Sequence, residues 1–92
     1  MTFREGTQVG QKEKLVNKLL SSPKTFTFDD ATALLGLMSY RLNNKGRTSG
    51  SRVMFVSDQH PKIILHKPHP QKELRDYQVR QLIELLRQEG LL

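Results

Sequence analysis

The segment from Thr48 to Leu74 constrains the fold of this 92-residue chain more than any other. It contains two short apolar runs, Arg52–Val56 and Ile63–His66, separated by a polar turn and followed by Pro68-His69-Pro70. Short apolar runs between turns are typical of β-strands. Because each proline fixes its own φ and restricts the residue before it, the Pro-His-Pro segment can continue neither a strand nor a helix. We therefore expect two strands and then a rigid turn.

An earlier stretch of the chain predicts a further strand. The residues from Tyr40 to Lys45 alternate in a way that is typical of a strand with one buried face. Tyr40 and Leu42 would face the core, and Arg41 and Lys45 would face solvent. The stretch from Gly46 to Ser51 is too polar and too rich in glycine for anything but a turn. The sequence thus predicts three antiparallel strands.

The orientation of the last strand has two alternatives. Either Ile63 and Leu65 or Ile64 and His66 face the core. Burying the purely apolar pair costs less free energy, because a buried imidazole needs a hydrogen-bond partner. We therefore expect His66 on the outer face of the sheet. Alternation along the preceding strand puts Arg52 on the same outer face.

Helical periodicity or helix-start signals mark three segments. The first is Gln11–Ser22, which carries a narrow leucine stripe. The second starts at Thr27, whose hydroxyl can cap the backbone N–H of Asp30. The third is Leu74–Glu89, which has the most regular apolar face in the chain. Its side chains and those of the central strand are expected to form the centre of the core, made of Val53, Phe55, Leu82, Ile83 and Leu86.

The order of these elements predicts an α+β fold. Helix, helix, three antiparallel strands and helix give a layer of helices on one face of the sheet and leave the other face free. A chain of this length suffices for one core. Residues 1–10 are polar and lack periodicity, so we expect them to be flexible and residues 11–92 to form a single domain.

The charge of the chain points to a polyanionic partner. Its formal net charge is +6 and its pI is about 10.0, values that are common among nucleic-acid-binding domains. There is no cysteine, which excludes disulfides and cysteine-based metal sites. Neither a signal-peptide pattern nor an apolar run of membrane-spanning length occurs, so a cytoplasmic protein without membrane contact is expected.

The basic side chains gather on the free face of the predicted sheet and at its edge. Arginine and lysine bind phosphate by charge and by bidentate donation, and the N–H and hydroxyl groups of the turn add neutral donors. An ordinary solvated sheet face is the alternative interpretation. The predicted RNA-binding residues are Arg41, Lys45, Arg47, Ser49, Ser51, Arg52 and Lys67.

Metal and cofactor chemistry finds little support in the sequence. The three histidines, His60, His66 and His69, have no recognised ligand spacing, and Asp58 and Glu73 are not set in a metal motif. No glycine-rich phosphate loop, Ser-His-Asp spacing or dinucleotide-binding pattern occurs. We expect no cofactor.

Two motifs, in their order along the chain, resemble a known family. The run Gly50-Ser51-Arg52-Val53-Met54-Phe55 is followed by Pro68-His69-Pro70-Gln71-Lys72-Glu73-Leu74 and by a helix that closes on Gly90-Leu91. This pattern resembles the HicA family of mRNA interferase toxins, which typically show a Gly-Ser-His-x-x-Phe strand start, a Pro-His-Pro-x-x-Glu-Leu loop and a final helix. The resemblance covers roughly residues 28–92.

The resemblance implies a fold like that of double-stranded-RNA-binding domains, in the order α-β-β-β-α, with an extra N-terminal helix here. It also implies the toxin of a type II toxin–antitoxin pair, cleavage of mRNA, and neutralisation by a HicB-type antitoxin. One departure matters for chemistry: Arg52 stands where the family has its catalytic histidine. Arginine stays protonated, so it can stabilise a phosphorane but cannot take a proton from a 2′-hydroxyl.

Three hypotheses follow for the activity. In the first, the chain is a ribonuclease in which Arg52 clamps the scissile phosphate while His66 or His69 serves as base or acid, because histidine changes charge near neutral pH. In the second, the chain binds RNA without cutting it. In the third, the basic face chiefly docks an acidic antitoxin. His69 is the first candidate for proton transfer, and a purely structural Pro-His-Pro turn is the alternative.

Overall fold

The computed structural model describes residues 10–43 and 52–92. The elements follow the order α2 (Gln11–Ser21), η1 (Pro23–Thr25), α3 (Phe28–Leu37), β1 (Arg41–Asn43), β2 (Arg52–Val56), β3 (Ile63–His66) and α4 (Asp76–Gln88). The prediction of an α+β fold of α-β-β-β-α order with an added N-terminal helix is confirmed. Residues 1–9 of the segment 1–10 that was predicted to be flexible lie outside the described residues, and so do four predicted RNA-binding residues: Lys45, Arg47, Ser49 and Ser51.

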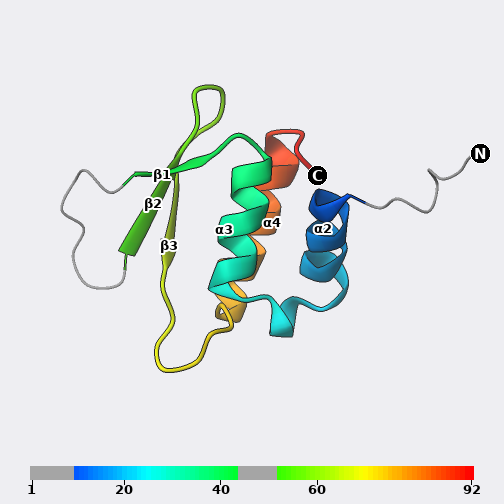
Figure 1. Ribbon diagram of the computed structural model, residues 1–92, viewed down its shortest axis with the longest axis vertical. Coiled ribbons are helices and arrows are strands. Elements are labelled where there is room, and N and C mark those ends of the chain that lie inside the picture. Colours follow the sequence, from blue (N-terminus) through cyan, green and yellow to red (C-terminus); the bar gives the residue numbers. More distant parts are fainter. Residues whose placement is uncertain (1–9, 44–51) are drawn as a thin grey trace, which may run out of the picture.

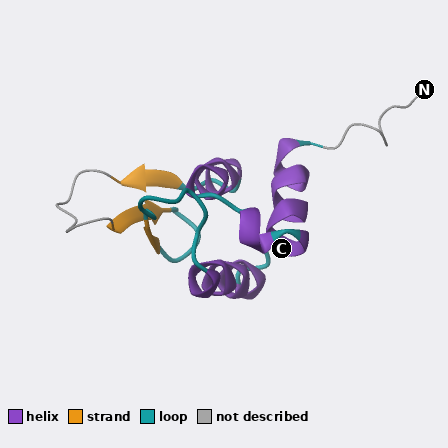
Figure 2. Cartoon of the chain, turned by 90° about the horizontal axis from the view of Figure 1, so that it is seen from below, coloured by secondary structure: helices purple, strands orange, loops and turns teal. Residues whose placement is uncertain are grey.

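The elements form three layers. The strands make one antiparallel sheet of order β1-β2-β3, which occupies the left side of Figure 1. Helices α3 and α4 cover one face of this sheet, and α2 packs against that helix pair on the side away from the strands (Figure 2). The described helices therefore lie on one side, as predicted, and within residues 10–43 and 52–92 no helix covers the opposite face of the sheet. None of the described helices has both the length and the apolar character needed to cross a membrane.

The register of the sheet confirms the predicted facing of its central and last strands. Along β2 and β3, Arg52 lies opposite His66 and Phe55 lies opposite Ile63. Ile63 and Leu65 are buried, whereas Ile64 and His66 are exposed. Of the two orientations open to this strand, the one that buries the apolar pair is the one observed.

The prediction for the first strand is partly wrong. Tyr40 is buried, and its hydroxyl donates a hydrogen bond of 2.7 Å to the carbonyl oxygen of Pro61, but it precedes β1. Leu42 lies opposite Phe55, on the helix-covered face, yet it stays 44% exposed. The reason is its position: β1 is a short edge strand, and α4 packs at the other edge, on β3.

Three of the five predicted core residues are buried, and the other two are only partly buried. Phe55, Leu82 and Leu86 are buried, while Val53 and Ile83 are only half-buried and pack against the cluster. The Phe55 ring meets the ring of Phe28 from α3, with centroids 6.2 Å apart. Strand β2 therefore contacts α3 through this ring pair and shares one core cluster with α4.

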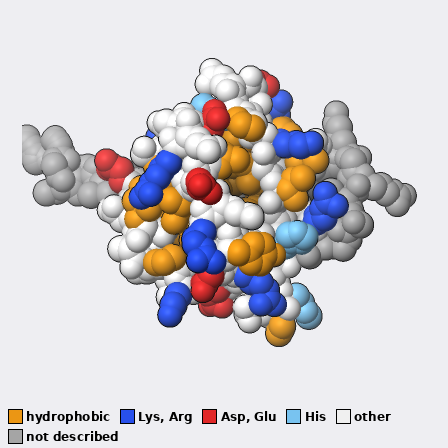
Figure 3. All heavy atoms as spheres, turned by 180° about the vertical axis from the view of Figure 1, so that it is seen from behind, with side chains coloured by type: hydrophobic (Ala, Val, Ile, Leu, Met, Phe, Trp, Pro, Cys, Tyr) orange, Lys and Arg blue, Asp and Glu red, His pale blue; other side chains and the backbone are white. Residues whose placement is uncertain are grey.

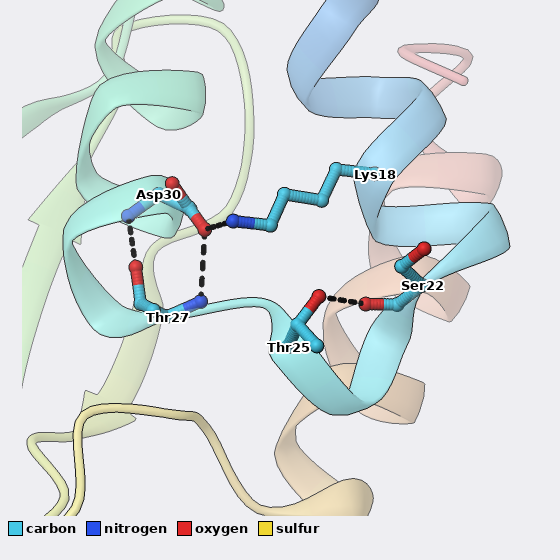
Figure 4. Close-up of polar contacts among 5 residues, drawn as sticks. All are labelled: Lys18, Ser22, Thr25, Thr27 and Asp30. Carbon is cyan, nitrogen blue, oxygen red and sulfur yellow. Dashed lines mark hydrogen bonds and ion pairs between the residues drawn. The ribbon is translucent and has the colours of Figure 1, made fainter.

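Helix α3 begins with the predicted cap. The hydroxyl of Thr27 accepts the N–H of Asp30 at 3.0 Å, and a carboxylate oxygen of Asp30 accepts the N–H of Thr27 at 3.0 Å. The same carboxylate accepts a hydrogen bond from the Lys18 ammonium of α2 at 2.7 Å (Figure 4). One aspartate thus caps α3 and fastens α2 to it.

This cap makes the attachment of α2 dependent on pH. Burial raises the pKa of the Asp30 carboxyl, but the hydrogen bonds from Lys18 and Thr27 outweigh burial, and the net pKa lies below the ordinary value of 3.8. A carboxyl with a lowered folded pKa contributes stability above pH 3.8, and this contribution is lost as the pH falls through the folded value.

We expect Asp30→Asn to lower the free energy of unfolding at neutral pH by about 0.5–1 kcal/mol, because Lys18 is partly exposed and the pair is screened. Asparagine keeps an oxygen that can accept the N–H of Thr27, so the charge alone is removed. Urea unfolding at neutral pH and well below pH 3.8 measures the effect. The variant and the wild type should converge in acid, and an equal gap at both pH values would contradict this account.

Candidate functional site

Two of the predicted catalytic residues face each other across the sheet. Arg52 and His66 are a directly opposed pair on β2 and β3, and both are exposed on the sheet face opposite α3 and α4. Directly opposed residues of antiparallel strands have Cβ atoms roughly 4.5–5.5 Å apart. The two side chains thus leave neighbouring strands on the same face, at the end of the sheet where β3 leads to α4.

A hollow of about 280 Å³ lies where β3, the Pro-His-Pro turn and the first turn of α4 meet. It brings His66 and His69 to one place, while Arg52 stands beside it on the neighbouring strand. In the view from behind, histidine side chains lie at the lower right among hydrophobic and basic side chains (Figure 3). The hollow is lined by His66, Lys67, Pro68, His69, Arg75, Tyr77 and Gln78.

A buried glutamine of α4 fixes the backbone at His66. The Gln78 side chain is only 3% exposed, and its Oε1 accepts the N–H of His66 at 2.6 Å. Its Nε2 donates to the carbonyl oxygen of the same residue at 3.1 Å. The amide thus takes the place of a neighbouring strand at the open edge of β3. His66 is held from α4 as well as from β2.

The turn that carries His69 is pinned at both of its ends. On the N-terminal side of the turn, the backbone of His66 is bonded to the Gln78 side chain. On its C-terminal side, the N–H of Leu74 donates to the carbonyl oxygen of Phe26 at 2.9 Å. The His69–Pro70 peptide bond is cis. The His69 ring is exposed, and among residues 10–43 and 52–92 it makes no hydrogen bond. Its nitrogens are therefore open to a ligand from the solvent side.

Lys67 separates two hollows. On one side it borders the hollow of His66 and His69. On the other it stands over the Phe28 ring, with its ammonium 5.9 Å from the ring centroid, and lines a second hollow of about 240 Å³ with Lys72 and Asp29. Its charge therefore acts on both sides of the Pro-His-Pro turn.

Arg41 is not brought to this site. It shares the outer face with Arg52 but lies opposite Val56, four residues further along β2, which is about 13 Å away. Its guanidinium pairs with Asp58 at 3.2 Å, and both side chains are exposed. The predicted placement of these two arginines on one outer face of the sheet is confirmed, and they stand at the two ends of that face.

The third histidine is also elsewhere. The Nδ1 atom of His60 lies 2.9 Å from a carboxylate oxygen of Glu89, and its ring stacks on Tyr40 at 6.3 Å. Burial, and next the negative charge of Glu89, raise the pKa of Tyr40. The three histidines do not converge, and the part of the chain described here contains no group of three His, Asp or Glu side chains that could hold a metal ion.

The family described as "HicA toxin of bacterial toxin-antitoxin" matches residues 33–91, well over half of the chain. The chain belongs to the HicA toxin family. No curated protein and no solved structure matches it. The HicA match starts within α3 and contains the whole sheet, the Pro-His-Pro turn and α4, so it includes every described residue of the candidate site.

Three residues of this HicA site were missed by reasoning from the sequence: Arg75, Tyr77 and Gln78. Gln78 stands one residue before Val79 and four before Leu82, on the buried stripe of α4. The sequence feature that could have revealed it is a polar residue at a position where the helical pattern expects an apolar one. Tyr77 is 45% exposed and lines the hollow beside both histidines. The only sequence feature that points to Tyr77 is an aromatic residue at the start of a helix. This feature is weak evidence for a site, because exposed aromatic side chains are common.

Proposed function

We propose that this chain is the toxin of a type II toxin–antitoxin pair and that it acts as an endoribonuclease on mRNA in the cytoplasm. The observation that carries the proposal is the opposition of Arg52 and His66 beside the hollow that contains His69. One cationic clamp and two imidazoles are the groups that cleavage of RNA by its own 2′-hydroxyl needs. The +6 charge and membership of the HicA family support an RNA substrate.

In the proposed reaction, one histidine takes the proton from a 2′-hydroxyl while its oxygen attacks the adjacent phosphorus. The bond from phosphorus to the 5′-oxygen of the next nucleotide breaks, and the second histidine donates a proton to that leaving oxygen. The products are a 2′,3′-cyclic phosphate and a free 5′-hydroxyl. Arg52 holds the charge that develops on the non-bridging oxygens, a role that suits a permanently protonated side chain.

The substrate is expected to be single-stranded at the cleaved position. Bases that are unpaired can be turned out and read individually, whereas the bases of an A-form duplex are stacked inside it. Lys67 and Arg75 border the hollow and supply charge for the flanking phosphates. We include Lys45, Arg47, Ser49 and Ser51 in the proposed contact surface because they closely precede Arg52 in the sequence.

The proposed antitoxin is of the HicB type and covers the same face. The centre of the helix-free sheet face is apolar, with Met54 opposite Ile64, while Arg52 and His66 stand at its end. An acidic partner with an apolar patch would match this pattern and would block access to the hollow. A complex of the two proteins that cleaves RNA as fast as the free toxin would exclude this arrangement.

We expect the purified chain to cleave RNA, and Arg52→Ala to weaken both RNA binding and cleavage while leaving the melting temperature unchanged. An exposed arginine contributes little to stability, and its removal deletes the clamp. The matched control is Arg41→Ala, which removes the same charge from the same face about 13 Å away. The control should keep most of the cleavage activity.

Three outcomes decide between the functions. Cleavage that falls in Arg52→Ala but not in Arg41→Ala supports the ribonuclease. Tight RNA binding by the wild type without any cleavage would favour a non-catalytic RNA-binding module of the same fold. Equal losses in both variants would mean that only net charge matters, and the Arg52 clamp would then be excluded.

A further inference from the structure

The two tyrosines of this chain have opposite environments. Tyr40 is buried, and its hydroxyl is bonded to the Pro61 carbonyl oxygen. Tyr77 is 45% exposed at the second position of α4 and borders the hollow that holds His66 and His69. Neither core packing nor a described hydrogen bond accounts for its aromatic ring. An exposed aromatic ring beside two imidazoles is the kind of surface on which a nucleobase stacks.

The surroundings of Tyr77 hold its backbone in place. It precedes Gln78, whose buried amide is tied to both backbone groups of His66. The helix turn that carries Tyr77 therefore cannot shift without breaking the contacts that hold the histidine. A platform on a rigid helix loses little entropy when it meets a ligand.

The charges around the ring suit a nucleotide. Arg75 and Lys67 line the same hollow, and no acidic side chain does. A flat apolar surface between two cations can hold a base and the phosphates on either side of it. Asp76, the acid nearest to Tyr77 in sequence, lines a different hollow together with Lys24 and Glu73.

We propose that this hollow is a nucleobase subsite, in which Tyr77 stacks on the base next to the phosphate held by Arg52 and Arg75 contacts the following phosphate. The inference rests on the proposed RNA substrate and specifies which residues bind one of its nucleotides. Stacking accepts any base, because every base has an aromatic face. The subsite therefore selects unpaired RNA over duplex rather than one sequence over another.

The test measures binding of a 2′-deoxy-substituted single-stranded RNA oligonucleotide, which lacks the attacking hydroxyl. Tyr77→Ala should weaken affinity roughly 5- to 150-fold, as expected for one stacked base at about 1–3 kcal/mol. Tyr77→Phe keeps the ring and should bind as the wild type does. The matched control is Leu37→Ala, which removes an apolar side chain of similar exposure (47%) from the far end of α3 and should have no effect.

A second measurement separates the base from the backbone. The chain contains no tryptophan, so its fluorescence comes from two tyrosines, and only Tyr77 lies at the hollow. Added oligonucleotide should quench the wild type and leave Tyr77→Phe unquenched. A series of oligonucleotides, each lacking one base but keeping every phosphate, should contain one that binds the wild type and Tyr77→Ala equally.

The outcomes separate this inference from the function on which it rests. A wild-type protein that does not bind the oligonucleotide overturns both. Binding by the wild type with unchanged affinity in Tyr77→Ala overturns the subsite alone. A loss in Tyr77→Ala that persists across the whole series of base-lacking oligonucleotides also overturns it, because Tyr77 would then be contacting the backbone.

Discussion

Phe55→Ala is expected to remove a large part of the stability of this protein and to lower its melting temperature strongly. Phe55 is almost fully buried on the central strand, opposite Leu42 on β1 and Ile63 on β3, and its ring contacts that of Phe28. Removing a buried phenylalanine side chain typically costs about 3–5 kcal/mol, of which part is the lost apolar burial and part the cavity left behind. The total stability of a domain is only about 5–15 kcal/mol.

Thermal and denaturant unfolding measure this loss. For a domain of this size, each 1 kcal/mol shifts the melting temperature by about 4–8 °C, so the variant should melt at least about 12 °C lower. Val53→Ala is the matched control, because Val53 faces the same way on the same strand but is only half-buried. Val53→Ala should lower the free energy of unfolding clearly less than Phe55→Ala does. A melting temperature of Phe55→Ala within a few degrees of the wild type would remove Phe55 from the centre of the core.

The elements that sequence reasoning predicted best are those with a local cause. The cap between Thr27 and Asp30 needs only two side chains one helical turn apart, so the start of α3 could be read directly. Alternation along β2 and β3 fixes which residues face the helices, and the cost of burying an imidazole chooses between the two faces of Ile63–His66. Each of these rests on residues a few positions apart.

The parts that could not be predicted depend on contacts between distant segments. Alternation places Arg52 and His66 on one face, but that they lie opposite each other depends on the register set by the turn between β2 and β3. The exposure of Leu42 depends on which edge of the sheet α4 covers. The bond of Gln78 to the backbone of His66 joins residues 12 positions apart, and no local pattern indicates it.

His69→Gln is expected to lower single-turnover cleavage of RNA by roughly a hundredfold or more, while RNA affinity and the melting temperature stay unchanged. Glutamine can donate and accept hydrogen bonds but cannot shuttle a proton near neutral pH. The His69 ring is exposed in the hollow and makes no described hydrogen bond, so its replacement removes no contact that stabilises the fold. Single-turnover kinetics isolate the chemical step from product release.

The chain offers its own control for this substitution. His60→Gln changes the same residue type at a different place, because His60 pairs with Glu89 at the C-terminal end of α4. Glu89 lies about 18 Å along the helix axis from Tyr77, which is at the start of the same helix. We expect this variant to lose some stability and to cleave RNA normally in its folded fraction. The opposite pattern, with cleavage lost in His60→Gln and kept in His69→Gln, would show that the catalytic site does not lie at the hollow lined by His66 and His69.

Full cleavage by a well-folded His69→Gln protein would exclude the two-histidine reaction and leave His66 as the candidate for proton transfer, and His66→Gln then becomes the decisive variant. The two hydrogen bonds from Gln78 go to the backbone of residue 66, so the substitution leaves the edge of β3 in place and changes only the ring. Loss of cleavage in this variant at unchanged RNA affinity would identify His66 as the proton-transfer group. If both variants cleave normally, no histidine transfers the proton, and the remaining possibility is Arg52 holding the phosphate while water accepts the proton.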